Sequence, residues 1–71
     1  MERNELEAIV EWILFTMGEA VEVRRIAAAV GLDEDTVREA VRGMMQRYEE
    51  NGRGIKIIEL EGAFQMCTKA S

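Results

Sequence analysis

The sequence predicts a mainly helical α+β fold that ends in a small β-hairpin. Three segments carry apolar residues at the spacing of an amphipathic helix, and a stretch rich in β-branched residues follows them. Glycines lie at the predicted boundaries, where they can end a helix or form a tight turn. The expected order is helix, helix, helix and hairpin. A chain of 71 residues has room for a single domain, which we expect to span residues 1–71.

The first helix is predicted over about residues 5–17, because its apolar residues recur three and four positions apart. Gly18 follows the last of them and is expected to end the helix. Residues 1–4 and 69–71 are expected to be loosely ordered ends. The inward-facing stripe of this helix is predicted to contain Leu6, Ile9, Val10, Ile13, Leu14 and Met17.

The second and third helices are predicted over residues 23–30 and from about residue 33 to Glu50. Asp33 is placed to cap the third helix, with Thr36 three residues later. Gly43 costs ~1 kcal/mol relative to alanine inside a helix, so either a close backbone contact or chance explains it. The inward residues are expected to be Ile26, Ala27 and Val30, then Val37, Val41, Met44, Met45 and Tyr48.

The hairpin is predicted from residues 51–54, which form a turn, to residue 68. Residues 55–60 read as a strand, 61–63 as a short turn and 64–68 as the return strand. Such a hairpin is not stable alone in water, so Phe64 and Met66 are expected to face the helices. The alternation slips between Ile57 and Ile58, which leaves a bulge and two partly covered faces as alternatives.

The junction of the second and third helices has the spacing of a helix-turn-helix. Ala27 is small enough to let the two helices approach, and Gly31 can adopt the left-handed turn between them. Val37 then packs the next helix on the previous one. Three helices with this turn and a following hairpin predict a winged helix-turn-helix.

The net charge and composition limit the classes of function that this chain can have. The net charge is −5, whereas a nucleic-acid binder normally carries a basic patch. Direct DNA binding is therefore not expected, and protein partners are favoured. No apolar run approaches 18 residues and no signal-peptide pattern is present, so a cytoplasmic protein without a membrane span is expected.

The residues of the commonest catalytic sites and of His–Cys zinc sites are missing. The chain has no histidine, its one serine is Ser71, and its one cysteine, Cys67, has no histidine partner. Cys67 is expected to be a packing residue, and neither an internal disulfide nor a His–Cys zinc site can form. We expect no enzyme activity, no metal and no cofactor.

The outer face of the third helix is unusually acidic for a DNA-reading helix. The three acids at its start suit the positive end of the helix dipole. Two charge pairs at helical spacing, Glu34–Arg38 and Glu39–Arg42, are expected to stabilise it. We favour this structural interpretation for the outer residues, which are Asp35, Glu39, Arg42, Gln46, Glu49 and Glu50.

Four cations are candidates for contact with a partner or with a DNA backbone. They are Arg24, Arg25, Arg53 and Lys56, of which the last two lie at the base of the wing. The competing interpretation is that they are scattered surface charges. An acidic partner protein is a third alternative.

The first helix has a second apolar face, formed by Ala8, Trp12 and Phe15. One alternative is that the hairpin or the chain's own tail covers this face. The other, which we favour, is that the face packs against a second copy across a two-fold axis. Aromatic anchors are enriched in the cores of such interfaces.

Several of these features together resemble the N-terminal winged-helix domain of segregation and condensation protein B (ScpB), over nearly the whole chain. Ala20 stands where that family usually has proline. The matching marks are Ile13-Leu14-Phe15 before Gly18-Glu19, the Gly31-Leu32 turn, Tyr48-Glu49-Glu50 before Gly52-Arg53-Gly54-Ile55, and the wing Glu61-Gly62-Ala63-Phe64-Gln65-Met66.

The resemblance implies a non-enzymatic accessory subunit of the bacterial SMC condensin complex, which acts in chromosome condensation and segregation. Such subunits dimerise largely through this first domain and bind the kleisin ScpA and, through it, SMC. The family has two winged-helix domains in tandem, so this chain is expected to be the N-terminal half of a longer protein. The second domain supplies much of the kleisin contact. A winged-helix transcription regulator is the alternative function.

Overall fold

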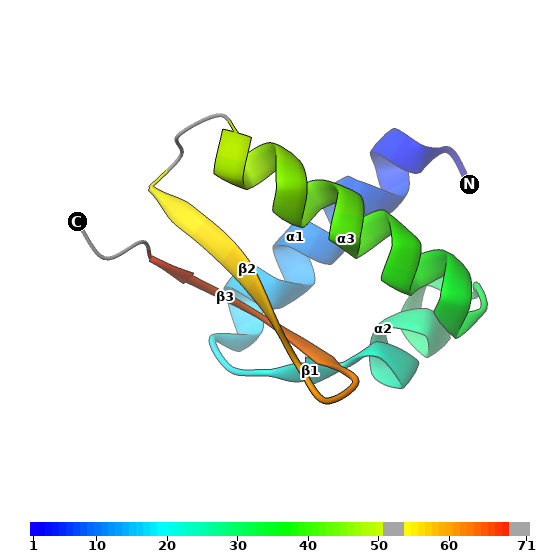
Figure 1. Ribbon diagram of the computed structural model, residues 1–71. Coiled ribbons are helices and arrows are strands. Elements are labelled where there is room, and N and C mark those ends of the chain that lie inside the picture. The colour runs from blue at the N-terminus through cyan, green and yellow to red at the C-terminus, as the bar shows by residue number, and fades with distance from the viewer. Residues whose placement is uncertain (51–53, 69–71) are drawn as a thin grey trace.

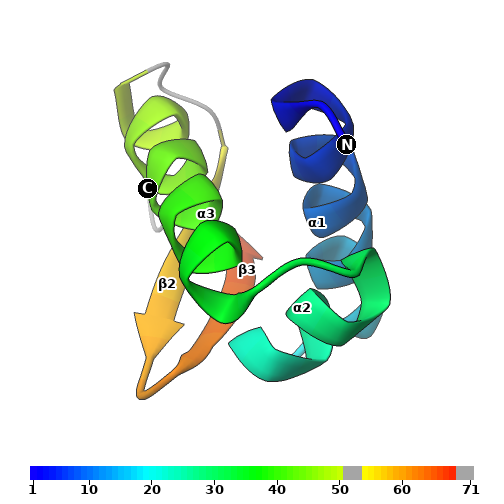
Figure 2. The same ribbon diagram turned by 90° about the vertical axis from the view of Figure 1, so that its right-hand side faces the viewer.

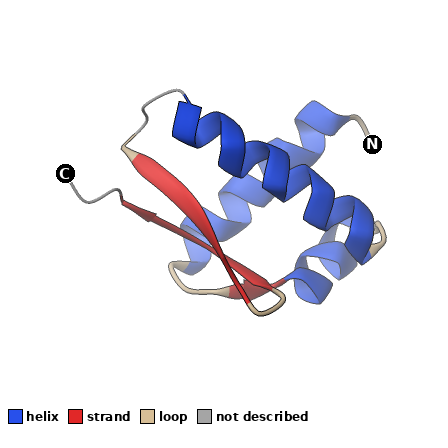
Figure 3. Ribbon diagram, viewed as in Figure 1, coloured by secondary structure: helices blue, strands red, loops and turns tan. Residues whose placement is uncertain are grey.

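The computed structural model describes residues 1–50 and 54–68, and the winged helix-turn-helix prediction is confirmed (Figures 1 and 3). The predicted turn at 51–53, including Arg53, and the predicted loose end at 69–71 lie outside these residues. The elements in order are α1 (Arg3–Met17), β1 (Val21–Glu22), α2 (Val23–Val30), α3 (Glu34–Glu50), β2 (Ile55–Leu60) and β3 (Ala63–Thr68).

Two glycines end the first two helices as predicted. Gly18 has φ 67° and donates its N–H to the Leu14 carbonyl at 3.3 Å. Gly31 has φ 74° and donates its N–H to the Ala27 carbonyl at 2.8 Å. These left-handed conformations are strained for any residue with a Cβ. The expected loose start is corrected, because α1 already begins at Arg3.

The predicted cap of α3 is present. One carboxylate oxygen of Asp33 accepts the Thr36 N–H at 2.9 Å, and the other accepts the Thr36 hydroxyl at 2.6 Å. These hydrogen bonds from Thr36 favour the charged form and lower the pKa of the Asp33 carboxyl. Asp33 therefore satisfies a backbone donor at the start of α3 that would otherwise lack a partner.

The sheet has three strands where two were predicted. Its order is β1-β3-β2, and β1 pairs antiparallel with β3 through Val21 opposite Phe64 and Glu22 opposite Ala63. A strand of two residues is too short to show an alternating pattern in the sequence. This added strand ties the segment between α1 and α2 to the hairpin.

The hairpin itself is regular. Its pairing runs from Ile55 opposite Thr68 to Leu60 opposite Ala63 without an extra residue, so the bulge is excluded. Ile57 is buried and Ile58 half-buried, which is the expected pattern when both faces are partly covered. The return strand begins one residue earlier than predicted, at Ala63.

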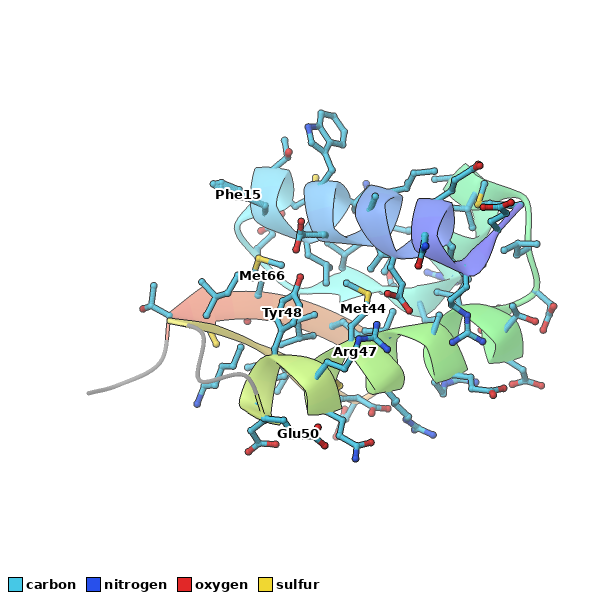
Figure 4. All side chains as sticks on the ribbon, turned by 90° about the horizontal axis from the view of Figure 1, so that it is seen from above. Phe15, Met44, Arg47, Tyr48, Glu50 and Met66 are labelled. Carbon is cyan, nitrogen blue, oxygen red and sulfur yellow. The ribbon has the colours of Figure 1, made fainter. Side chains whose placement is uncertain are left out.

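The core lies where the three helices and the sheet meet (Figure 2). Met44 and Tyr48 point from α3 toward α1 (Figure 4). The buried core residues are Leu6, Val10, Leu14, Val21, Val23, Ile26, Ala27, Val37, Ala40, Val41, Met44, Tyr48, Ile57 and Phe64.

The inward stripe of α1 is narrower than predicted. Leu6, Val10 and Leu14 are buried, whereas Ile9 and Met17 are 37% and 38% exposed. Ile9 lies about 100° around the helix from Val10, at the margin of the stripe, and Met17 is the last residue of α1.

Gly43, inside α3, has open space around it. A Cβ at this position would meet only the Arg47 side chain, at 3.7 Å. No close backbone contact therefore requires glycine at this position.

Candidate protein interface

The second apolar face of α1 is open to solvent. Trp12 and Phe15 are each 68% exposed, and Ala8 is exposed beside them. The hairpin therefore does not cover these side chains, and the tail at 69–71 named in the other alternative lies outside the described residues. Spacings of four and three residues place the three on one side of the helix. We call this surface, formed by Ala8, Trp12 and Phe15, the Trp12 face.

The Trp12 face and the hairpin together line a groove. An open groove of about 450 Å³ is lined by Ala8, Glu11, Trp12, Phe15, Ile55 and Met66. A second hollow of about 280 Å³ shares Phe15, Ile55 and Met66 and extends to Cys67. Phe15 thus borders two apolar hollows, near Met66 of β3 (Figure 4). Half-buried Cys67 is consistent with the packing role predicted for it.

Polar contacts fix α1 against α3 beside this groove. The Tyr48 hydroxyl donates a hydrogen bond to the Glu11 carboxylate, which lines the groove. One turn earlier on α1, Glu7 forms an ion pair with Arg47 of α3. These contacts hold the carboxylates of Glu7 and Glu11 toward α3, while the rings of Trp12 and Phe15 stay exposed.

The outer face of α3 is occupied by internal ion pairs. The Arg42 guanidinium reaches across to Glu59 of β2, with Nη2 2.9 Å from Oε2. The Glu39–Arg42 pair predicted within the helix does not form among the described residues. Hydrogen bonding from Arg42 lowers the pKa of Glu59. Arg38 pairs with Asp35 at 2.8 Å and with Glu34 at 3.9 Å, as the helical spacing predicted for the latter.

The three candidate cations that the structure describes, Arg24, Arg25 and Lys56, do not form one basic patch. Arg24 pairs with Glu22 at 3.2 Å and borders a polar hollow that includes Glu61. Arg25 borders a separate, apolar hollow between α1 and α2. Lys56 is exposed on β2, on another element. The phosphate backbone of DNA would therefore meet separated or neutralised charges.

Neither a metal centre nor a membrane span is found in the part of the chain that the structure describes. No group of three or more His, Cys, Asp or Glu residues there is arranged to hold a metal ion. No helix there is long and apolar enough to cross a membrane. The apolar hollows beside Trp12 and Phe15 suit contact with another polypeptide.

The sequence comparisons agree with the resemblance. Residues 8–71 match the family described as Segregation and condensation complex subunit ScpB. A Segregation and condensation protein B from Lachnoclostridium phytofermentans is 64% identical over 70 residues, covering 99% of this chain and 37% of that relative. Another from Agathobacter rectalis is 47% identical over 64 residues, covering 89% and 34%. The chain thus spans little more than a third of these relatives.

Two solved structures are similar in fold. One is the crystal structure of a dimer of the ScpB N-terminal domain complexed with ScpA peptide, with a TM-score of 0.86 and 31% identity. The match covers 93% of this chain and 83% of that chain. The other is ScpB from Mycobacterium tuberculosis, with a TM-score of 0.92 and 21% identity over 99% of this chain and 44% of that chain. The winged-helix chain described above belongs to the ScpB family of segregation and condensation complex subunits.

Proposed function

We propose that this chain is the N-terminal winged-helix module of a cytoplasmic, non-enzymatic accessory subunit of the bacterial SMC condensin complex. It would act in chromosome condensation and segregation by forming a homodimer and binding the kleisin ScpA. The observation that carries the proposal is the open Trp12 face on a fold similar to the ScpB N-terminal domain. That neighbour was crystallised as a dimer complexed with ScpA peptide.

The Trp12 face supports a two-fold dimer. A two-fold contact uses the same surface on both copies, so a surface with both an anchor and a groove can satisfy itself. Trp12 is a large exposed anchor, and the adjoining groove has an apolar wall formed by Ile55 and Met66. A small domain also gains stability from further burial on association. We expect Trp12 of each copy to enter the groove of the other.

The alternative function, a DNA-binding regulator, lacks comparable support. The outer face of α3 would enter the major groove in such a protein. Here Arg38 and Arg42 on that helix are engaged by carboxylates of the same chain. A phosphate would have to displace those partners in a chain of net charge −5.

Two titrations test the proposal against the regulator. ScpA from the same organism and labelled duplex DNA are each titrated into the protein at two salt concentrations. We expect ScpA to bind and DNA to show no salt-sensitive binding. Tight, salt-sensitive DNA binding together with no ScpA binding would overturn the proposed function in favour of the regulator.

A further inference from the structure

A second apolar hollow lies on the other flank of α1, between α1 and α2. It has a volume of about 150 Å³ and is lined by Ile13, Met17, Val21, Arg25, Ile26 and Ala29. Val21 and Ile26 are buried and form its floor, whereas Met17 and Ala29 are exposed at its rim. Ile13 lies about 100° around the helix from Trp12, so this hollow is distinct from the Trp12 face.

Arg25 is the one charged residue among the described residues that line this hollow. Within residues 1–50 and 54–68, Arg25 forms no ion pair and none of the lining residues is acidic. By contrast, four arginines of the same part of the chain are paired with carboxylates: Arg24, Arg38, Arg42 and Arg47. An exposed guanidinium beside an apolar hollow is complementary to an apolar side chain that is followed by a carboxylate.

The same charge argues against a second copy of this chain as the occupant. If two copies met through this hollow across a two-fold axis, each Arg25 would approach the Arg25 of the other copy. No lining carboxylate would offset that repulsion. The volume is also below the ~300–1,000 Å³ of a small-molecule site and suits a single aliphatic side chain.

We propose that the α1–α2 hollow binds a segment of the kleisin that carries an apolar side chain next to an acidic residue. The apolar side chain sits between Met17 and Ala29, over the floor formed by Ile26. The acidic residue pairs with the Arg25 guanidinium at the rim. This site deepens the proposed function and rests on it, because ScpA supplies the segment.

Calorimetric titration of ScpA from the same organism into the 71-residue chain tests the site with two matched pairs of variants. Arg25→Glu reverses the charge at the rim and is expected to weaken ScpA binding by about tenfold. Arg24→Glu changes the neighbouring arginine, which borders a different hollow, and is expected to leave the affinity within about twofold. Ala29→Glu places a carboxylate in the hollow one turn after Arg25 and should also weaken binding. Ala28→Glu, at an exposed position outside the hollow, should not.

The outcomes separate this site from the proposed function. Loss of affinity in Arg25→Glu and Ala29→Glu alone, with unchanged circular dichroism, supports the site. Normal ScpA binding by all four variants overturns the site and leaves the proposed function standing. Equal weakening by Arg24→Glu and Arg25→Glu also overturns it, because a general charge effect then explains the loss. Failure of the unmodified 71-residue chain to bind ScpA overturns both this site and kleisin binding by this chain.

Discussion

Arg42 of α3 and Glu59 of β2 form a two-pronged ion pair that joins the third helix to the wing. The Arg42 Nε lies 3.1 Å from Oε1 of Glu59, and Nη2 lies 2.9 Å from Oε2. Such a planar fork matches both oxygens of the carboxylate and fixes their orientation. The pair links α3 to the hairpin and neutralises a cation on the outer face of α3.

We expect the Glu59→Gln variant to lose stability at neutral pH and to respond less to acid. The pKa of Glu59 is lowered by hydrogen bonding from Arg42, so its folded value lies below its unfolded value. Its contribution to stability is therefore present above the unfolded pKa and is lost as pH falls through the folded pKa. Urea unfolding at neutral pH and at ~pH 3 should show a smaller acid loss in the variant than in the unmodified chain.

Glu19→Gln is the matched control, because Glu19 is exposed and forms no ion pair within the described residues. This control should keep the acid response of the unmodified chain. An identical acid response in Glu59→Gln and Glu19→Gln would show that the fork contributes nothing to pH-dependent stability.

Two substitutions at Asp33 separate the cap from its charge. Asp33→Asn keeps an oxygen that can accept the Thr36 N–H, whereas Asp33→Ala removes it. We expect the melting temperature to fall further in Asp33→Ala than in Asp33→Asn, as followed by circular dichroism. Equal melting temperatures for the two variants would contradict a capping role for the side chain.

Gly43→Ala and Gly31→Ala should change stability in opposite directions. Gly43 lies inside α3, and its Cβ would make only an ordinary contact with Arg47, so alanine should stabilise by ~1 kcal/mol. Gly31 has φ 74°, where a Cβ costs about 1–2 kcal/mol. Chemical denaturation of both variants measures the two effects. Destabilisation by Gly43→Ala would indicate a packing constraint at that position.

Much of the fold followed from local signals in the sequence. The bounds of α2, the left-handed glycine at 31 and the cap at Asp33 depend on neighbouring residues, and each was predicted correctly. β1 was missed because its two residues pair with β3 far along the chain. The exposure of Ile9 and Met17 was also missed, since periodicity defines a face but not how much of it a neighbour covers.

The candidate interface surface was predicted only in part, for a similar reason. The wide apolar pattern of α1 indicated the Trp12 face, because helical spacing alone places its three members together. The groove beside it needs Ile55 and Met66, whose positions depend on how the hairpin packs. Helical spacing likewise suggested Glu39 as the partner of Arg42, whereas the tertiary fold brings Glu59 closer.

Sedimentation equilibrium of the unmodified chain, Trp12→Ala and Leu60→Ala tests most directly whether the Trp12 face is a dimer interface. Leu60 is an exposed apolar residue on β2, away from that face, and serves as the control. We expect the unmodified chain and Leu60→Ala to be dimers, and Trp12→Ala to dimerise about 30-fold more weakly while its circular dichroism stays that of a folded chain. A monomer at high concentration for the unmodified chain would contradict the account.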